Sequence, residues 1–267
     1  MSRFIGSVPK LTTPLALIFQ HETRYWSCIS TVEQRDGWVA FHNRQFVSRI
    51  DPNHAGEFRA KVGQSPDIVQ DILEFYQTLG AVPAAYIDLL ATPEDLVPQL
   101  RKANFQEWTG ALADLMLYLG PDEARPMTVA VEVVETAPAK EAWASLMAEE
   151  DTHDAHAQAR LQALYRTQIS DPRMAAYLIR VAGEPVSRCQ LFSCEGLGRI
   201  EAVRTSTAYQ GRGLAAAIIR QALNDSLQQN HITYIYAEPG SNAQRLYHRL
   251  GFRTVARRAI RGFLWQG

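Results

Sequence analysis

The chain has 267 residues, enough for one large domain or two domains of ordinary size. Hydrophobic residues make up 46% and charged residues 21%, as in ordinary globular proteins, and the formal net charge is −1. This composition excludes a fibrous or disordered chain, and the charge gives no overall positive field that would attract nucleic acid or anionic lipid.

Targeting and redox features indicate a cytoplasmic protein. No run approaches the ~20 apolar residues of a membrane span, and the apolar patch near the N-terminus has no signal-peptide cleavage pattern after it. The cysteines, Cys28, Cys189 and Cys194, are odd in number and suggest neither a disulfide framework nor a metal site. We therefore expect no nucleic-acid partner, no membrane partner and no bound metal.

The first half of the chain is predicted to alternate helices and strands. Ser65, Pro66 and Asp67 predict a helix start, with Ser65 as the N-cap and proline in the first turn, and apolar residues then recur at helical spacing. The predicted helices cover residues 14–28, 65–79 and 93–103. The predicted strands cover residues 37–41, 45–50, 84–88 and 105–119.

The second half repeats a similar order after a segment, residues 120–126, that contains two prolines and a glycine. Its predicted helices cover residues 138–150, 155–169, 213–228 and 241–250. Its predicted strands cover residues 127–134, 175–182, 185–194, 198–205, 232–237 and 252–265. We predict an α/β (α+β) fold with domains 1–120 and 127–267 joined by a linker at 121–126, arranged as a possible duplication.

The most informative segment follows the predicted strand that ends at Thr205. A turn containing Gly211 and Gly213 leads directly into an alanine-rich helix. Glycine lets the backbone approach a ligand closely, and the free N–H groups of a helix start favour a bound anion. The spacing matches neither the dinucleotide fingerprint nor a Gly-Lys-Ser/Thr phosphate loop. From the glycines alone, an anion site and an ordinary turn before a packed helix remain equally open.

Two motifs together resemble the GNAT superfamily of acyl-CoA-dependent N-acetyltransferases. The first is Gln210-Gly-Arg-Gly-Leu-Ala215, which matches the signature Gln/Arg-x-x-Gly-x-Gly/Ala. The second is Ser241-Asn-Ala-Gln-Arg-Leu-Tyr247-His-Arg-Leu-Gly-Phe252, similar to the family's Asn and Tyr on a helix that ends in Gly-Phe. A helix and a buried strand separate them, as in the family, and the resemblance covers residues 127–267.

The resemblance implies a mixed, mostly antiparallel sheet flanked by helices, and transfer of an acetyl group from acetyl-CoA to a primary amine within a ternary complex. The strand before the loop would diverge from the strand after it, so that Val203 and Thr205 bind the pantetheine arm through their backbones. Asn242 would contact the pantetheine or the acyl end. The pyrophosphate would lie against Gln210, Gly211, Arg212, Gly213, Leu214 and Ala215.

Tyr247 matches the general acid of the family, which protonates the departing thiolate; the alternative is a tyrosine whose ring only packs against the sheet. Glu201 shares a strand face with Val203 and Thr205 and is our candidate base. An ion-paired glutamate, with water as the base, is the alternative. His153 and His156 lie in an acidic segment that could be a cationic-substrate patch, a metal cluster or simply a solvated face.

The first half resembles a degenerate GNAT domain, as in tandem members of the superfamily. Its counterpart of the glycine loop has one glycine and Pro66, which removes an N–H donor. We therefore expect acetyl-CoA to bind the second half only, with a small-molecule or peptide amine as acceptor. Two alternatives stay open: a non-catalytic acyl-CoA sensor or scaffold, and an acyltransferase that uses a different acyl chain.

Overall fold

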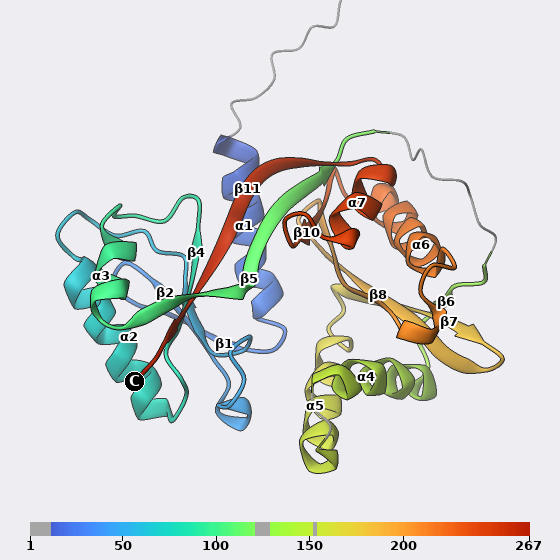
Figure 1. Cartoon of the computed structure of the whole chain (residues 1–267), viewed down its shortest axis with the longest axis horizontal. Helices are drawn as coiled ribbons and strands as arrows, with labels where there is room; N and C mark the ends of the chain where they lie inside the picture. The colour runs from blue at the N-terminus through green and yellow to red at the C-terminus, as the bar shows by residue number, and fades with distance from the viewer. Residues whose placement is uncertain (1–11, 121–128, 152–153) are drawn as a thin grey trace, which may run out of the picture. The chain divides into compact units, whose positions relative to one another are not determined.

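The structure is a computed structural model that describes residues 12–120, 129–151 and 154–267. The chain contains both helices and strands throughout its length, which confirms the predicted mixed α/β class (Figure 1). The chain divides into two compact units. Unit 1 comprises Met1–Glu107 and Phe263–Gly267, and unit 2 comprises Trp108–Gly262.

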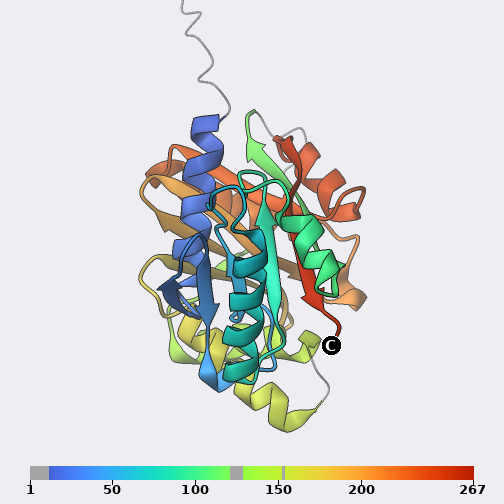
Figure 2. The ribbon, with the colours of Figure 1, turned by 90° about the vertical axis from the view of Figure 1, so that its left-hand side faces the viewer.

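Unit 1 is built around a sheet crossed by one central helix. Its helices are α1 (Thr12–Trp26), α2 (Ser65–Leu79) and α3 (Leu96–Lys102), and its strands are β1 (Thr31–Gln34), β2 (Val39–His42), β3 (His54–Gly56) and β4 (Ala84–Asp88). The order is β1-β2-β3-β4, antiparallel except for the parallel β3/β4 pair that α2 connects. Figure 2 shows α2 lying over the strands of this unit. Ile68, Ile72 and Tyr76 of α2 enter a core that includes Trp38 and Ala85.

Two local predictions in unit 1 are wrong, and two short strands were missed. Residues 45–50 do not form a strand: a short 3-10 helix, Arg44–Phe46, begins after Asn43, whose side chain accepts a hydrogen bond from the Gln45 N–H. Strands β1 and β3, of four and three residues, were not predicted. Ser65 is not the N-cap of α2, because Gln64 holds that position while the Ser65 hydroxyl donates to Asp95 at 2.7 Å.

Unit 2 has a longer sheet with helices on both faces. Its helices are α4 (Ala137–Asp151), α5 (Ala155–Gln168), α6 (Leu214–Gln229) and α7 (Asn242–Arg249). Its own strands are β6 (Glu132–Val133), β7 (Met174–Val181), β8 (Glu184–Cys194), β9 (Leu197–Thr205) and β10 (Ile232–Ala237). Most of β5 (Phe105–Tyr118) and β11 (Phe252–Trp265) also lies in this unit. In Figure 1, α4 and α5 lie on one side of the strands and α6 and α7 on the other.

The strand order of unit 2 is β11-β5-β10-β9-β8-β7-β6. The pairs of β10 with β5, β9 with β8, β8 with β7 and β7 with β6 are antiparallel, and only β9 and β10, which α6 connects, are parallel among the pairs described. Unit 1 therefore repeats the strand–helix–strand crossover of unit 2, with α2 in the place of α6. This supports the prediction of two similar halves.

Strands β5 and β11 each have residues in both units. Strand β5 lies between β10 and β11 of unit 2, and Met116 is buried in the core of that unit. The last five residues return to unit 1, where Phe263 is buried and the Trp265 N–H donates to Pro83 at 3.0 Å. The units thus divide after Glu107 and after Gly262. Residues 121–126 lie outside the described part of the chain, so the domains 1–120 and 127–267 stay a prediction.

Candidate active site

The parallel strands β9 and β10 separate towards their C-terminal ends. Their pairing stops at Ile200 opposite Ile235, whereas β9 stays paired with β8 as far as Thr205. Beyond Ile200, the edge of β9 that faces β10 has no strand partner among the described residues. Backbone groups in such a position need another partner, and an extended ligand that carries amides can provide it.

The loop after β9 leads to a helix start that no described side chain caps. Gly211 and Gly213 have φ angles of 74° and 78°, which only glycine adopts without strain. Helix α6 has no acidic residue in its first turn, and the Ala217 N–H donates back to the Gly213 carbonyl at 3.1 Å. The earlier N–H groups of the turn therefore lack carbonyl partners within the helix, and they carry the positive end of its dipole.

This loop has room for an anion beside it. A Cβ atom at Gly211 would meet no atom within 4 Å. Gln210 connects the loop to the end of β9, because its side-chain amide donates to the Thr205 carbonyl at 3.1 Å. Arg212 is exposed and packs its guanidinium over the ring of Tyr209 at 5.0 Å. Free N–H groups, a helix start and open space fit the pyrophosphate of CoA.

The remaining predicted contact residues lie at the same end of the sheet. Val203 packs against the core of unit 2, and the Thr205 hydroxyl lies 2.9 Å from the hydroxyl of Ser187. The side chains of these two residues are therefore engaged within the protein, and the Thr205 carbonyl accepts from Gln210. Contact of their backbones with a ligand stays a prediction. Asn242 is exposed at the start of α7 and accepts a hydrogen bond from Arg245.

Tyr247 points inward from α7. The residue is 5% exposed and lies in the same core cluster as Cys189 and Phe252. Burial raises the pKa of Tyr247 above its usual value, and the nearby charges of Glu201 and Cys189 raise it further. Its phenol is therefore protonated at neutral pH, which is the form that a general acid needs. Packing and acid catalysis are both compatible with this position.

Glu201 is held by a neighbour that the sequence analysis did not select. Arg199 donates to Oε2 of Glu201 from Nη2 at 2.5 Å and from Nε at 3.1 Å, and the Ala202 N–H donates to Oε1 at 3.1 Å. Ala202 has a positive φ of 55°, where β9 shifts its register against β8. The spacing of two residues between Arg199 and Glu201 was the signal available for this ion pair. The carboxylate is thus ion-paired, and its role as a base stays a prediction.

The other chemically active side chains do not gather into a second centre. His153 lies outside the described residues, and His156 is exposed on α5. Within the described ranges, no three His, Cys, Asp or Glu side chains are grouped in a way that could hold a metal ion. Cys189 is buried, and burial raises the pKa of its thiol. No described helix combines the length and hydrophobicity needed to cross a bilayer.

Comparisons with known proteins agree with this geometry. The model of the acetyltransferase (GNAT) family matches residues 139–252, which include β9, the glycine loop and Tyr247. A search of curated proteins gave no match. A GCN5-related N-acetyltransferase from Kribbella flavida is similar in structure, with a TM-score of 0.71, 17% identity and coverage of 95% of this chain and 96% of that one.

Two further solved structures share the fold over most of the chain. A putative GNAT-family acetyltransferase from Novosphingobium aromaticivorans has a TM-score of 0.55, 17% identity and coverage of 90% and 92%. A tandem GNAT protein from the clavulanic acid biosynthesis pathway has a TM-score of 0.54, 11% identity and coverage of 79% and 74%. The segment of residues 139–252 is therefore a GNAT acetyltransferase domain.

Proposed function

We propose that unit 2 transfers the acetyl group of acetyl-CoA to a primary amine of a small molecule or peptide, by direct attack within a ternary complex. One observation carries the proposal: the open edge of β9 beyond Ile200 continues directly into the glycine loop and the uncapped start of α6. An amide-containing arm that ends in a pyrophosphate is complementary to both features in that order.

Acetyl transfer needs a neutral amine as nucleophile, a base that removes a proton from this amine, and an acid that protonates the departing sulfur. The amine nitrogen attacks the acetyl carbon, the C–S bond breaks, and Oη of Tyr247 gives its proton to the departing sulfur. The surplus proton of the amine goes to Glu201 or to water. Arg199 donates two hydrogen bonds to Oε2 of Glu201, whereas Oε1 accepts one, from the Ala202 N–H. We therefore favour Oε1 as the oxygen that receives the proton.

We expect the acceptor to be an amine for two reasons. Residues 139–252 match the acetyltransferase (GNAT) family, and a protein named as an N-acetyltransferase shares the fold. The ion pair of Glu201 favours one competing function, a non-catalytic sensor of acyl-CoA, because the candidate base is already engaged.

Calorimetry with acetyl-CoA, followed by a panel of primary amines assayed for free CoA thiol, separates the two functions. We expect one molecule of acetyl-CoA per chain and thiol release that depends on at least one amine. Stoichiometric binding without thiol release from any amine would support the sensor. Absence of binding would contradict both.

A further inference from the structure

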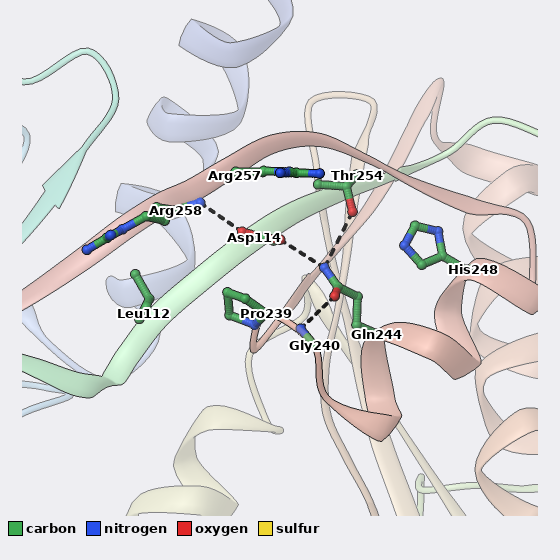
Figure 3. A pocket seen from close by; sticks show the side chains of 9 residues that line it. All are labelled: Leu112, Asp114, Pro239, Gly240, Gln244, His248, Thr254, Arg257 and Arg258. Carbon is green, nitrogen blue, oxygen red and sulfur yellow. Dashed lines mark hydrogen bonds between the residues drawn. The ribbon is translucent and has the colours of Figure 1, made fainter.

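A cavity of about 530 Å³ lies beside α7, among β5, the loop between β10 and α7, and β11 (Figure 3). All of its lining residues belong to unit 2. None of them is a residue that we assign to acetyl-CoA or to catalysis. The cavity therefore needs a separate explanation.

Hydrogen bonds centred on Asp114 hold the walls of the cavity together. Asp114 of β5 is 5% exposed. Its carboxylate accepts from the Arg258 N–H of β11 at 2.8 Å and from the Gln244 amide of α7 at 2.9 Å. The Gln244 side chain also accepts from the Gly240 N–H at 2.8 Å. Two strands, a helix and a loop are thus fixed around one carboxylate, as Figure 3 shows.

The bond to Arg258 stabilises an irregularity in β11 at two consecutive arginines. Arg257 and Arg258 are consecutive exposed residues between the buried Ala256 and Ala259, and Arg258 has a φ of 50°. In a regular strand, consecutive side chains point to opposite faces. A bulge of this kind redirects a side chain, and here both arginines line the cavity.

The polar groups of the cavity are mainly hydrogen-bond donors. Arg257 makes no hydrogen bond or ion pair within the part of the chain that the structure describes. Figure 3 shows its side chain extending along β11 towards Thr254, whose hydroxyl also faces the cavity. His248 lies 3.1 Å through Nδ1 from the Phe252 carbonyl, which orients its ring. The lining residues carry more positive than negative charge, because they include two arginines and one aspartate. The oxygens of Asp114 already accept hydrogen bonds from Gln244 and from the backbone N–H of Arg258.

We propose that this cavity binds the oxyanion group, carboxylate or phosphate, of a small-molecule ligand, with Arg257 as the principal contact. A guanidinium presents paired donors that match the two oxygens of a carboxylate or phosphate. Thr254 and His248 flank that position, and Asp114 fixes the bulge. The ligand class follows from the donors in the wall and does not depend on the acyl-transfer proposal.

The test is titration calorimetry of the full chain with inorganic phosphate and, separately, with succinate, at an ionic strength matched with chloride. We expect at least one of the two anions to bind and Arg257→Gln to weaken its binding about tenfold or more, since bonds to charged groups are the strong ones. The anion that binds more tightly identifies phosphate or carboxylate as the source. Arg249→Gln is the matched control, because it removes the same charge from an exposed residue of α7 that does not line the cavity.

Two results would overturn the proposal: no binding of either anion at millimolar concentration, or equal weakening by the two variants. If phosphate binds only at the glycine loop, its affinity would fall in Gly213→Glu and not in Arg257→Gln. That result would also contradict the proposal. Arg257 and Arg249 are both exposed. Melting temperatures that equal the wild-type value without ligand would show that each variant is folded.

Discussion

Gly251 and Gly120 meet backbone to backbone: a Cβ atom on Gly251 would lie 2.3 Å from the carbonyl oxygen of Gly120. The Leu119 N–H donates to the Gly251 carbonyl at 3.1 Å, so the end of β5 is bonded to the turn that follows α7. Gly251 also has a φ of 92°. The glycine of the second motif is thus required for both space and conformation.

Gly251→Ala is therefore expected to lower the free energy of unfolding by about 2–4 kcal/mol, from backbone strain together with the clash. Gly80→Ala is the control, because Gly80 ends α2 with a φ of 79° and would meet nothing within 4 Å. It should cost only the strain, about 1–2 kcal/mol. Urea unfolding measures both, and equal losses would contradict the role of the Gly120 contact.

Gly213→Glu is expected to abolish measurable binding of acetyl-CoA in calorimetry, because it places an anionic side chain at the start of α6. Gly183→Glu is the matched control: Gly183 also has a positive φ, of 88°, with open space around it in the turn between β7 and β8. It should keep wild-type affinity. Wild-type affinity in Gly213→Glu would show that the pyrophosphate binds elsewhere.

Tyr247→Phe is expected to reduce turnover by ~10²–10⁴-fold, the usual contribution of a positioned acid, and the lower end is favoured because a thiol pKa of ~8.5 makes thiolate a fair leaving group. Affinity for acetyl-CoA should hardly change, since the ring still packs with Phe252. Turnover is to be measured on the best acceptor found, together with the melting temperature. Turnover within about threefold of wild type would make Tyr247 a packing residue.

Unit 1 should lose stability in mild acid because of His54. This residue is 1% exposed and stacks between Phe41 and Tyr86, with ring centroids at 4.6 and 4.3 Å. Burial lowers its pKa to about 3. In the unfolded chain its pKa is ~6.5, so between these values only the unfolded state binds the proton. The contribution of the neutral His54 to the free energy of unfolding is complete above about pH 6.5. It is lost as the pH falls below that value, by up to about 1.4 kcal/mol per pH unit.

Urea unfolding between about pH 7 and about pH 5 measures this effect above the range in which most carboxylates titrate. Burial also lowers the pKa of His42 and raises that of Glu57, so the comparison with His54→Gln is needed to assign the slope. His54→Gln should flatten the dependence on pH. His156→Gln, which changes an exposed histidine of α5, should leave it unchanged. The same slope in all three proteins would mean that His54 is protonated in the folded state.

Fragments test where the domains divide. A fragment of residues 108–262 contains β5 between β10 and β11, whereas one of residues 127–262 lacks it and loses Met116 from the core. We expect cooperative thermal unfolding only for the longer fragment, since removal of β5 leaves an edge of β10 exposed. Cooperative unfolding of the shorter fragment with a similar melting temperature would favour the boundary at 121–126.

The sequence predicted those parts of the fold whose signals are local. Helix α2 has clear apolar periodicity, and the two motifs indicated the family. Residues 45–50 were misassigned because Phe46 and Val47 suggest a strand, while side-chain bonds from Asn43 and Asn53 fold the segment into turns. The insertion of β5 beside β10 could not be predicted, because no local pattern records which distant strand fills a sheet.

The candidate site was predictable to a similar degree. The glycine loop was visible in the spacing of Gly211 and Gly213. The spacing of Arg199 and Glu201 was a signal for their ion pair that the sequence analysis did not use. The cavity beside α7 could not be predicted, because Asp114 bonds to Arg258, which is 144 residues away in the sequence.

The position of the last five residues in unit 1 has a consequence for synthesis on the ribosome. Phe263–Gly267 belong to unit 1, so the whole sequence of unit 2 must be translated before unit 1 has all of its residues. Until then the core around α2 lacks Phe263, so the segment 12–107 is expected to leave apolar surface exposed. Native contacts that join residues so distant in sequence also slow folding. Although most of unit 1 is made first, its core is therefore expected to be completed only after unit 2 has been translated.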